Sequence, residues 1–232
     1  MAIKINKNGA FGVHNTTKRT GKIEYIVIHY VGATGDAKNN VDYYNRVTST
    51  HASADFFVGH KGDIWQYNPD LQKRYCWAVG GTKQSTRGGK FYGKCTNKNS
   101  VSIELCLKTH GNTAANSKDW YFTRETMEAA VELTRHLMDE LGIGADHVLR
   151  HYDVTGKLCP GVYGWNIESG SESTWRAFLE ELEKDELAEA CQKLAKAGII
   201  NSPDYWAKGK GYSDENTVLL IKKFAAALKR GG

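Results

Sequence analysis

The sequence predicts an α/β protein in which a mixed central β-sheet is flanked by helices and is followed by a small all-α module. Apolar stretches of strand type alternate with amphipathic helical stretches through residues 1–184, which is the arrangement expected of a sheet covered by helices. Residues 185–232 contain helical periodicity alone. The length of 232 residues suits one main domain with an appendage.

The strands of the main domain are predicted from their apolar and β-branched composition. The first, residues 23–31, is almost continuously apolar, as expected of a strand buried on both faces, and Gly32 interrupts it. A short helix is predicted over residues 39–47, and residues 80–99, rich in glycine, lysine, threonine and asparagine, form a long loop. The remaining predicted strands are residues 54–58, 64–67 and 101–107, and residues 147–151 are predicted to be a short strand or an extended segment.

Residues 123–141 form the clearest predicted helix, because apolar side chains recur there with the helical period of 3.6 residues. Thr123 is suited to cap the start of this helix, and Gly142 is suited to end it. A second amphipathic helix is predicted further along, where Ser169 and Glu172 have the spacing of a capping box.

The C-terminal module is predicted to contain three short helices. Gly198 ends the first, with Ile199 and Ile200 placed to fold back on it. Pro203 begins the second, at a position where its missing N–H has no intrahelical partner to lose. So short a module is near the lower limit for independent stability, and we expect it to dock on the main domain.

Composition and charge exclude several classes of protein. Hydrophobic residues make up 41% of the chain and charged residues 25%, which is ordinary for a globular protein. The 31 basic and 26 acidic residues give a net charge of +5 without a basic stripe, so no nucleic-acid partner is expected. No apolar run has the length of about 18 residues that a membrane span requires. The N-terminal segment lacks the apolar core of a secretory signal, so we expect the protein to be made and kept inside the cell.

The cysteines are five in number, and none of them forms a CxxC pair. This pattern argues against a disulfide framework and favours free thiols or a metal ligand. Cys106 and Cys191 lie in apolar patterns and are expected to be small buried side chains. Cys159 differs from these two, because it precedes Pro160 in a polar loop that is poor core material.

Two histidines and Cys159 are the residues best suited to bind a metal ion. His29 ends the first apolar strand, where α/β folds place their sites, although a lone histidine there is more often a core residue. His151 and Cys159 lie eight residues apart in a turn-rich segment, and an imidazole and a thiolate suit zinc. Together the three would supply the protein ligands of a catalytic zinc ion, whereas an incidental free thiol is the alternative for Cys159.

Glu104 and Lys157 are candidate catalytic residues beside such a centre. Glu104 shares one face of its predicted strand with Ser102, and that face is either solvated or turned towards a cleft. In a zinc cleft, Glu104 would be a natural general base for the metal-bound water. Lys157 lies two residues from Cys159 and either stabilises a developing oxyanion or is an ordinary surface lysine.

The motifs around these residues resemble those of a known enzyme family. They are Ile-Val-Ile-His at residues 26–29, Cys-Trp-Ala-Val-Gly-Gly at residues 76–81, Val-Ser-Ile-Glu at residues 101–104, and Arg-His through Lys-Leu-Cys-Pro at residues 150–160. In this order and spacing they resemble the N-acetylmuramoyl-L-alanine amidases of the phage endolysin and peptidoglycan recognition protein superfamily, amidase type 2. The resemblance covers about residues 20–182.

The resemblance implies a zinc hydrolase that cleaves the amide between N-acetylmuramic acid and L-alanine in bacterial peptidoglycan, on a fold with a mixed central sheet surrounded by helices. It implies that His29, His151 and Cys159 are the zinc ligands. It further implies Glu104 as the base and Lys157 as the residue that assists the transition state. Zinc is therefore the expected cofactor, and residues 1–184 are the expected catalytic domain.

The resemblance also implies residues that contact the substrate. Trp77 lies in the tryptophan-containing segment of the family, and Asp55 and Tyr30 are the other candidates for substrate binding. Many relatives have a tyrosine or a histidine near the metal where this chain has Ala54 and Asp55, which shifts weight onto Glu104 as the base. The aromatic side chains near the long loop either line the glycan–peptide groove or belong to the core; they are Trp65, Tyr67, Trp77, Phe91 and Tyr92.

A phage or prophage endolysin is the expected biological role. It would wait in the host cytoplasm until a holin, an indirect partner, opens the membrane, and would then act on the cell wall without inserting into the membrane. A host autolysin and a non-catalytic peptidoglycan-binding protein of the same fold are the alternatives, and the presence of Cys159 and Lys157 favours an enzyme over the latter. Residues 185–232 are a possible cell-wall-binding or docking element, in which Tyr205, Trp206 and Tyr212 form either a wall-binding patch or a small core. The oligomeric state stays open.

Overall fold

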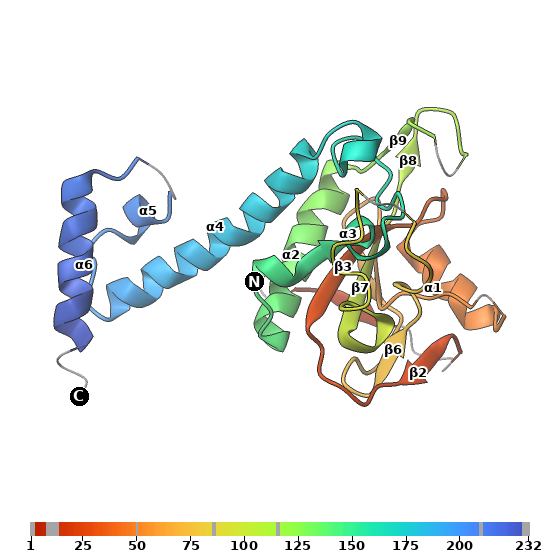
Figure 1. Ribbon diagram of the computed structural model, residues 1–232, viewed down its shortest axis with the longest axis horizontal. Coiled ribbons are helices and arrows are strands. Elements are labelled where there is room, and N and C mark those ends of the chain that lie inside the picture. The colour runs from red at the N-terminus through yellow and green to blue at the C-terminus, as the bar shows by residue number, and fades with distance from the viewer. Residues whose placement is uncertain are drawn as a thin grey trace. The chain divides into compact units, whose positions relative to one another are not determined.

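The computed structural model describes residues 3–7, 14–49, 51–84, 87–114, 117–208 and 211–228, with the backbone alone for helix residues 184–186 and 225–228 (Figure 1). The chain divides into two compact units, Met1–Arg176 and Ala177–Gly232. We describe each unit by itself.

The first unit is built on a six-stranded sheet in the order β1-β5-β4-β7-β3-β10. The strand pairs are parallel except for β4 and β5, which are antiparallel, so the prediction of a mixed sheet is confirmed. The strands are β1 (Ile5–Lys7), β3 (Tyr25–Tyr30), β4 (Phe56–Val58), β5 (Ile64–Gln66), β7 (Ser100–Leu105) and β10 (Val148–Arg150).

The central strands β3 and β7 are buried on both faces, as their unbroken apolar sequences predict. Ile26 and Ile28 of β3 point to one face of the sheet, together with Ile103 of β7, and all three are fully buried. Residues that alternate with these point to the opposite face, where His29 and Glu104 are found. Burial of both faces fixes the register, because a slip of one residue would exchange the two sets of side chains.

Helix α2 (Arg124–Leu141) covers one face and contacts β3, β4 and β7. Its predicted caps are confirmed, since the Thr123 hydroxyl accepts a hydrogen bond from the backbone N–H of Thr126 and Gly142 adopts a left-handed conformation with φ of 65°. Helices α1 (Ala37–Arg46) and α3 (His151–Thr155) lie on the opposite face. Figure 1 shows α3 at the edge of the sheet beside β3.

Short elements complete the first unit, and the sequence did not predict them because each is too brief for a periodic pattern. Two antiparallel ladders pair β2 with β6 and β8 with β9. Their strands are β2 (Thr16–Lys18), β6 (Arg74–Cys76), β8 (Lys108–Thr109) and β9 (Trp120–Tyr121), and the 3-10 turns are η1 (Asn97–Asn99), η2 (Ala145–His147) and η3 (Ile167–Ser169).

The capping box predicted for Ser169 and Glu172 is wrong. Ser169 ends the turn η3, where Asn166 is the capping residue and accepts a hydrogen bond from the backbone N–H of Ser169. The Glu172 carboxylate pairs with Arg150 instead of capping a helix. Tertiary partners thus override the local spacing, and helix α4 begins only at Ser173.

The second unit contains most of α4 (Ser173–Lys196), together with α5 (Pro203–Trp206) and α6 (Asp214–Leu228). Helix α4 is continuous through Lys184, so the sequence boundary placed after that residue lies inside a helix. The predicted ends are present: Gly198 has a φ of 69°, Ile200 is buried, and Pro203 is at the start of α5. The rings of Tyr205, Trp206 and Tyr212 contact one another in edge-to-face and tilted arrangements, with centroids 5.0–5.8 Å apart.

All five cysteines are free, as the sequence predicts. None of the helices within the described ranges is long and apolar enough to cross a membrane.

Candidate metal centre

The site begins at the carboxyl ends of the two central strands. His29 of β3 and Glu104 of β7 are direct partners in the parallel register, so their side chains leave the same face of the sheet next to each other. Carboxyl ends of parallel strands are where open α/β sheets form their binding crevices. The two apolar strands therefore place the side chains of His29 and Glu104 next to each other at this edge of the sheet.

His151 and Cys159 reach this point from the neighbouring strand. Strand β10 pairs with β3 so that Arg150 lies opposite Ile28, and His151 follows as the first residue of α3. Gly156 ends α3 in a left-handed conformation, and the chain turns back until the Cys159 carbonyl accepts a hydrogen bond from the backbone N–H of Tyr152. This tight return places Cys159 beside the helix start.

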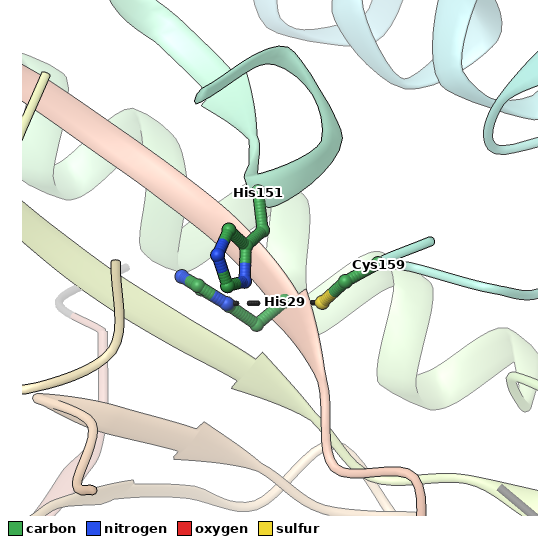
Figure 2. A group of neighbouring side chains, drawn as sticks. All are labelled: His29, His151 and Cys159. Carbon is green, nitrogen blue, oxygen red and sulfur yellow. Dashed lines mark hydrogen bonds between the residues drawn. The ribbon is translucent and has the colours of Figure 1, made fainter. Parts of the chain in front are cut away.

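The donor atoms of the three predicted ligands converge. One ligand atom from each of His29, His151 and Cys159 lies within 4.8 Å of the other two. The Cys159 sulfur is 3.8 Å from Nδ1 of His29, and the two imidazole centroids are 4.7 Å apart at an interplanar angle of 60°. Figure 2 shows the two rings and the thiol turned towards a common point. All three side chains are buried, with exposed fractions of 2%, 4% and 2%.

The hydrogen bonding of this cluster is incomplete. Nε2 of His29 and both ring nitrogens of His151 are buried without a hydrogen-bond partner among the described residues. Buried polar atoms are almost always satisfied, so such a group calls for an additional partner. Two imidazole nitrogens and one sulfur are a donor set that zinc accepts, and three protein ligands are the number found in catalytic zinc sites. The residues present therefore fit a zinc ion.

Electrostatics keep the histidines in the form that binds metal. Burial lowers the pKa of His29 far below its ordinary value, and the neighbouring His151 and Lys157 lower it further. Burial, with Lys157, lowers the pKa of His151 to about 4. Burial and the charge of Glu104 raise the pKa of the Cys159 thiol, whereas a hydrogen bond from the Tyr30 backbone N–H lowers it in part. Neutral imidazoles are ready ligands, whereas the thiol must lose its proton when metal binds.

Glu104 has the properties of a general base. Burial raises the pKa of Glu104 to about 7, although the positive charge of Lys157 lowers it. Its Oε2 atom is buried and has no hydrogen-bond partner among the described residues. A carboxylate with a pKa near neutrality and an unoccupied oxygen is able to accept and return a proton at physiological pH.

Lys157 is exposed and lies between the end of α3 and Cys159. Its charge acts on the pKa of four groups of the cluster: His29, Glu104, His151 and Cys159. The structure therefore brings Lys157 close to the same point as the candidate ligands.

The residues predicted to bind substrate are not together. Asp55 is 1% exposed, and its oxygens accept hydrogen bonds from the Ser102 backbone and hydroxyl and from Asn68, so the structure gives it a supporting role and does not favour substrate contact. Tyr30 is half-buried, and its ring lies against Gly161, where an added Cβ would approach the hydroxyl to 2.9 Å. Trp77 lines a separate cavity beside the long loop.

Sequence reasoning missed Arg150, which holds the start of α3. Its guanidinium bonds both carboxylate oxygens of Asp153, at 2.6 and 2.9 Å, and one oxygen of Glu172 at 2.8 Å. It also stacks over the ring of Trp175. The short spacing from Arg150 to Asp153 is a signal in the sequence, but Glu172 is a distant partner that no local pattern indicates.

Comparisons with known proteins agree with this geometry. The family model described as N-acetylmuramoyl-L-alanine amidase matches residues 19–162. The amidase CwlL of Bacillus licheniformis is 28% identical over 172 residues, which cover 69% of this chain and 41% of the relative. The amidase CwlA of Bacillus subtilis (strain 168) is 27% identical over 164 residues, which cover 69% and 52% of the two chains. The chain thus spans about half the length of these curated relatives, or less.

Solved structures show the same fold. A mutant endolysin from Bacillus subtilis superposes with a TM-score of 0.54 at 25% identity, covering 78% of this chain and 99% of that one. The structure of PlyL gives a TM-score of 0.54 at 22% identity, with coverages of 78% and 97%. Since the family model spans more than half of the chain, and its range includes the whole His29, His151 and Cys159 cluster, this chain belongs to the N-acetylmuramoyl-L-alanine amidase family.

Proposed function

We propose that this chain is a zinc-dependent amidase that hydrolyses the bond between the lactyl group of N-acetylmuramic acid and L-alanine in peptidoglycan. The observation that carries the proposal is the convergence of His29, His151 and Cys159 with unsatisfied donor atoms. Glu104 lies directly beside His29 in the sheet register, so a base with a raised pKa accompanies the ligand set. The family assignment supports the choice of this amide as the bond that is cleaved.

The three side chains would hold the ion by one ring nitrogen of His29, one ring nitrogen of His151 and the sulfur of Cys159. Zinc, when bound by such a set, makes water acidic enough to supply hydroxide near neutral pH and polarises a carbonyl group. Burial of the ligands excludes bulk water, which strengthens the electrostatic interactions in the site.

Glu104 would carry the proton through the reaction. Its carboxylate accepts a proton from the attacking water while the tetrahedral carbon forms. With its pKa near 7, the same carboxyl group then returns the proton to the nitrogen of L-alanine, so that the amine leaves in a neutral form. One residue thus acts first as base and then as acid, and no net proton is consumed by Glu104.

Lys157 would stabilise the oxyanion of the tetrahedral intermediate. Its ammonium group is exposed, and its charge acts on every other group of the cluster, so a negative charge that develops there is also within its influence. A substrate that covers the site would strengthen this interaction by excluding water.

The biological role that we propose is lysis of the cell wall by a phage or prophage endolysin. The similarity to a solved endolysin from Bacillus subtilis supports this role. A host autolysin is the alternative that the curated Bacillus amidases favour. For residues 185–232 we propose a docking or wall-binding role outside the reaction itself.

Digestion of purified cell walls tests the proposed function. We expect turbidity to fall with the zinc-loaded protein and to stay constant after a chelator removes the metal. Mass analysis of the fragments should show free lactyl carboxylates and new L-alanine amino termini. Wall binding without release of fragments would instead establish the non-catalytic alternative.

A further inference from the structure

A cationic loop lies next to the metal centre. Residues 80–99 contain five basic residues and no Asp or Glu. All five side chains are exposed. Four of the five are lysines, and within the described ranges none of these four forms a salt bridge with a carboxylate. The loop therefore presents positive charge that its own residues leave unneutralised. These basic residues are Lys83, Arg87, Lys90, Lys94 and Lys98.

The loop is fixed to the helix that carries His151. Backbone N–H groups of Gln84, Gly89 and Phe91 donate hydrogen bonds to carbonyl groups of α3, at distances of 2.6, 2.9 and 3.0 Å. Gly88 packs so closely that an added Cβ would lie 2.6 Å from the Tyr152 carbonyl oxygen. The positive charge is thus held at a defined place relative to the metal centre.

A cavity of about 590 Å³ opens between this loop, the end of β6 and α3. This volume is in the range of sites that bind small organic ligands, which is about 300–1,000 Å³. Three aromatic rings and one lysine give it both apolar walls and a positive charge. The lining includes Tyr75, Trp77, Tyr92, Lys98, Val154 and Thr155.

The distance between cavity and metal centre suits a peptide. Val154 and Thr155 lie in the same five-residue helix as His151, and such a helix is about 7.5 Å long. Two or three extended residues of a peptide span about 7–10 Å. A stem peptide whose first amide lies at the metal centre would therefore place its following residues at the cavity. Those residues carry carboxylates in peptidoglycan that is not amidated.

We infer that the cavity beside Trp77 and Lys98 binds the stem peptide, and that Lys98 selects peptides with free carboxylates over amidated ones. The inference rests on the proposed function and adds a specificity to it. Aromatic walls receive the apolar parts of the peptide, while Lys98 supplies the complementary charge. Helix α3 and the loop attached to it then contact the substrate at two places, the metal centre and the cavity.

Steady-state hydrolysis of two soluble muropeptide substrates by the zinc-loaded protein tests the inference. One has free carboxylates in its stem peptide, and the other has the same carboxyl groups amidated. We expect the Lys98→Gln variant to raise KM for the free-carboxylate substrate about twofold to fivefold, with kcat and zinc content unchanged. For the amidated substrate we expect a higher KM in the wild type and no further change in the variant.

Lys61→Gln is the matched control, because Lys61 is exposed in a turn beside α2, on the opposite face of the sheet. It removes the same charge and should leave both KM values unchanged. Equal KM values for the two substrates in the wild type would overturn the carboxylate site while leaving the amidase intact. Cleavage of neither substrate would overturn the proposed function and the inference with it.

Wall polymers that carry phosphate are excluded as the source of the effect by the same assay, because soluble muropeptides contain none. If Lys98→Gln changed only the digestion of walls that retain such polymers, the loop would bind phosphate and the inference would be wrong. Added salt should reduce the advantage of the free-carboxylate substrate in the wild type more than in Lys98→Gln.

Discussion

Two buried polar clusters lie two residues apart on β7, and they differ in how completely their atoms are paired. In the first, here called the Asp55 cluster, Asp55, Ser102 and Asn68 form hydrogen bonds of 2.7–2.8 Å that engage both carboxylate oxygens. In the second, the metal centre, three of the four histidine nitrogens and one oxygen of Glu104 have no partner among the described residues. The two histidines and Cys159 are about as buried as Asp55, so the pairing of the atoms, and not burial, distinguishes the two clusters.

The difference separates a structural role from a chemical one. A closed network such as the Asp55 cluster stabilises one arrangement of β4 and β7, and it leaves no atom for a ligand. An open network is costly in the free protein, and a bound cation would offset that cost. Residue type alone would not have told the two carboxylates apart, since Asp55 and Glu104 were both candidates for the site.

The largest effect is expected when a ligand of the metal centre is removed. Cys159→Ser should lose zinc and reduce activity by about 10³-fold or more, because the metal supplies several kcal/mol of transition-state stabilisation. Metal analysis of the purified variant, together with its rate on cell walls, measures both losses. Cys106→Ser is the control, since this buried thiol lies in the apolar cluster with Val41 and Phe57. Retention of zinc by Cys159→Ser would contradict the proposal that Cys159 is a metal ligand.

Glu104→Gln should separate metal binding from catalysis. The amide keeps the shape of the side chain but cannot accept the proton, so we expect kcat to fall by about 10²–10⁴-fold. Zinc content should stay at the wild-type level. At pH 4.5, where the buried carboxyl group is protonated, the stability of the metal-free protein should change by less than about 1 kcal/mol, because Oε2 has no partner to lose. Activity within a factor of two of the wild type would remove Glu104 from the mechanism.

Asp55→Ala should show the opposite behaviour. Loss of the carboxylate leaves the Ser102 and Asn68 donors buried and unpaired, so we expect the free energy of unfolding to fall by about 3 kcal/mol. Denaturant unfolding measures the change, and zinc binding by the folded fraction should persist. If this variant were as stable as the wild type but failed to act on its substrate, Asp55 would belong to the site after all.

The smallest effect is a pH dependence of stability in the metal-free protein. Folding raises the pKa of Glu104 from 4.5 to about 7, so its contribution to stability is present below pH 4.5 and is lost as the pH rises through 7. Relative to Glu104→Gln, the wild type should therefore lose about 3 kcal/mol between pH 4.5 and pH 7.5. His151, whose pKa is lowered, makes the opposite contribution to the pH dependence of stability. Because both proteins contain His151, its contribution cancels when their stabilities are subtracted. A constant difference across this range would contradict the buried environment assigned to Glu104.

The sequence predicted those parts of the fold and site that depend on local patterns. The apolar runs of β3 and β7 gave the two central strands, and Thr123 and Gly142 gave the ends of α2, because each signal lies within a few residues. His29, His151 and Cys159 were candidate ligands from their residue types and motif order, and in the structure one ligand atom from each lies within 4.8 Å of the other two.

What the sequence could not predict depends on partners that are distant in the chain. The spacing of Ser169 and Glu172 satisfies a capping rule, but Arg150 competes for Glu172 from 22 residues away. The hydrogen bonds of Asp55 could not be predicted for the same reason, since Ser102 and Asn68 become its partners only after the sheet has formed. The attachment of the cationic loop to α3 likewise rests on backbone hydrogen bonds, which leave no trace in side-chain composition.

Titration of the metal-free protein with zinc tests the central claim most directly, if the release of L-alanine amino termini from cell walls is followed at each addition. The account predicts that activity is absent without metal, rises in proportion to the zinc added and reaches its plateau at one equivalent per chain, with no rise for Cys159→Ser. Full amidase activity in the metal-free protein, or one bound equivalent of zinc without any release of amino termini, would contradict it.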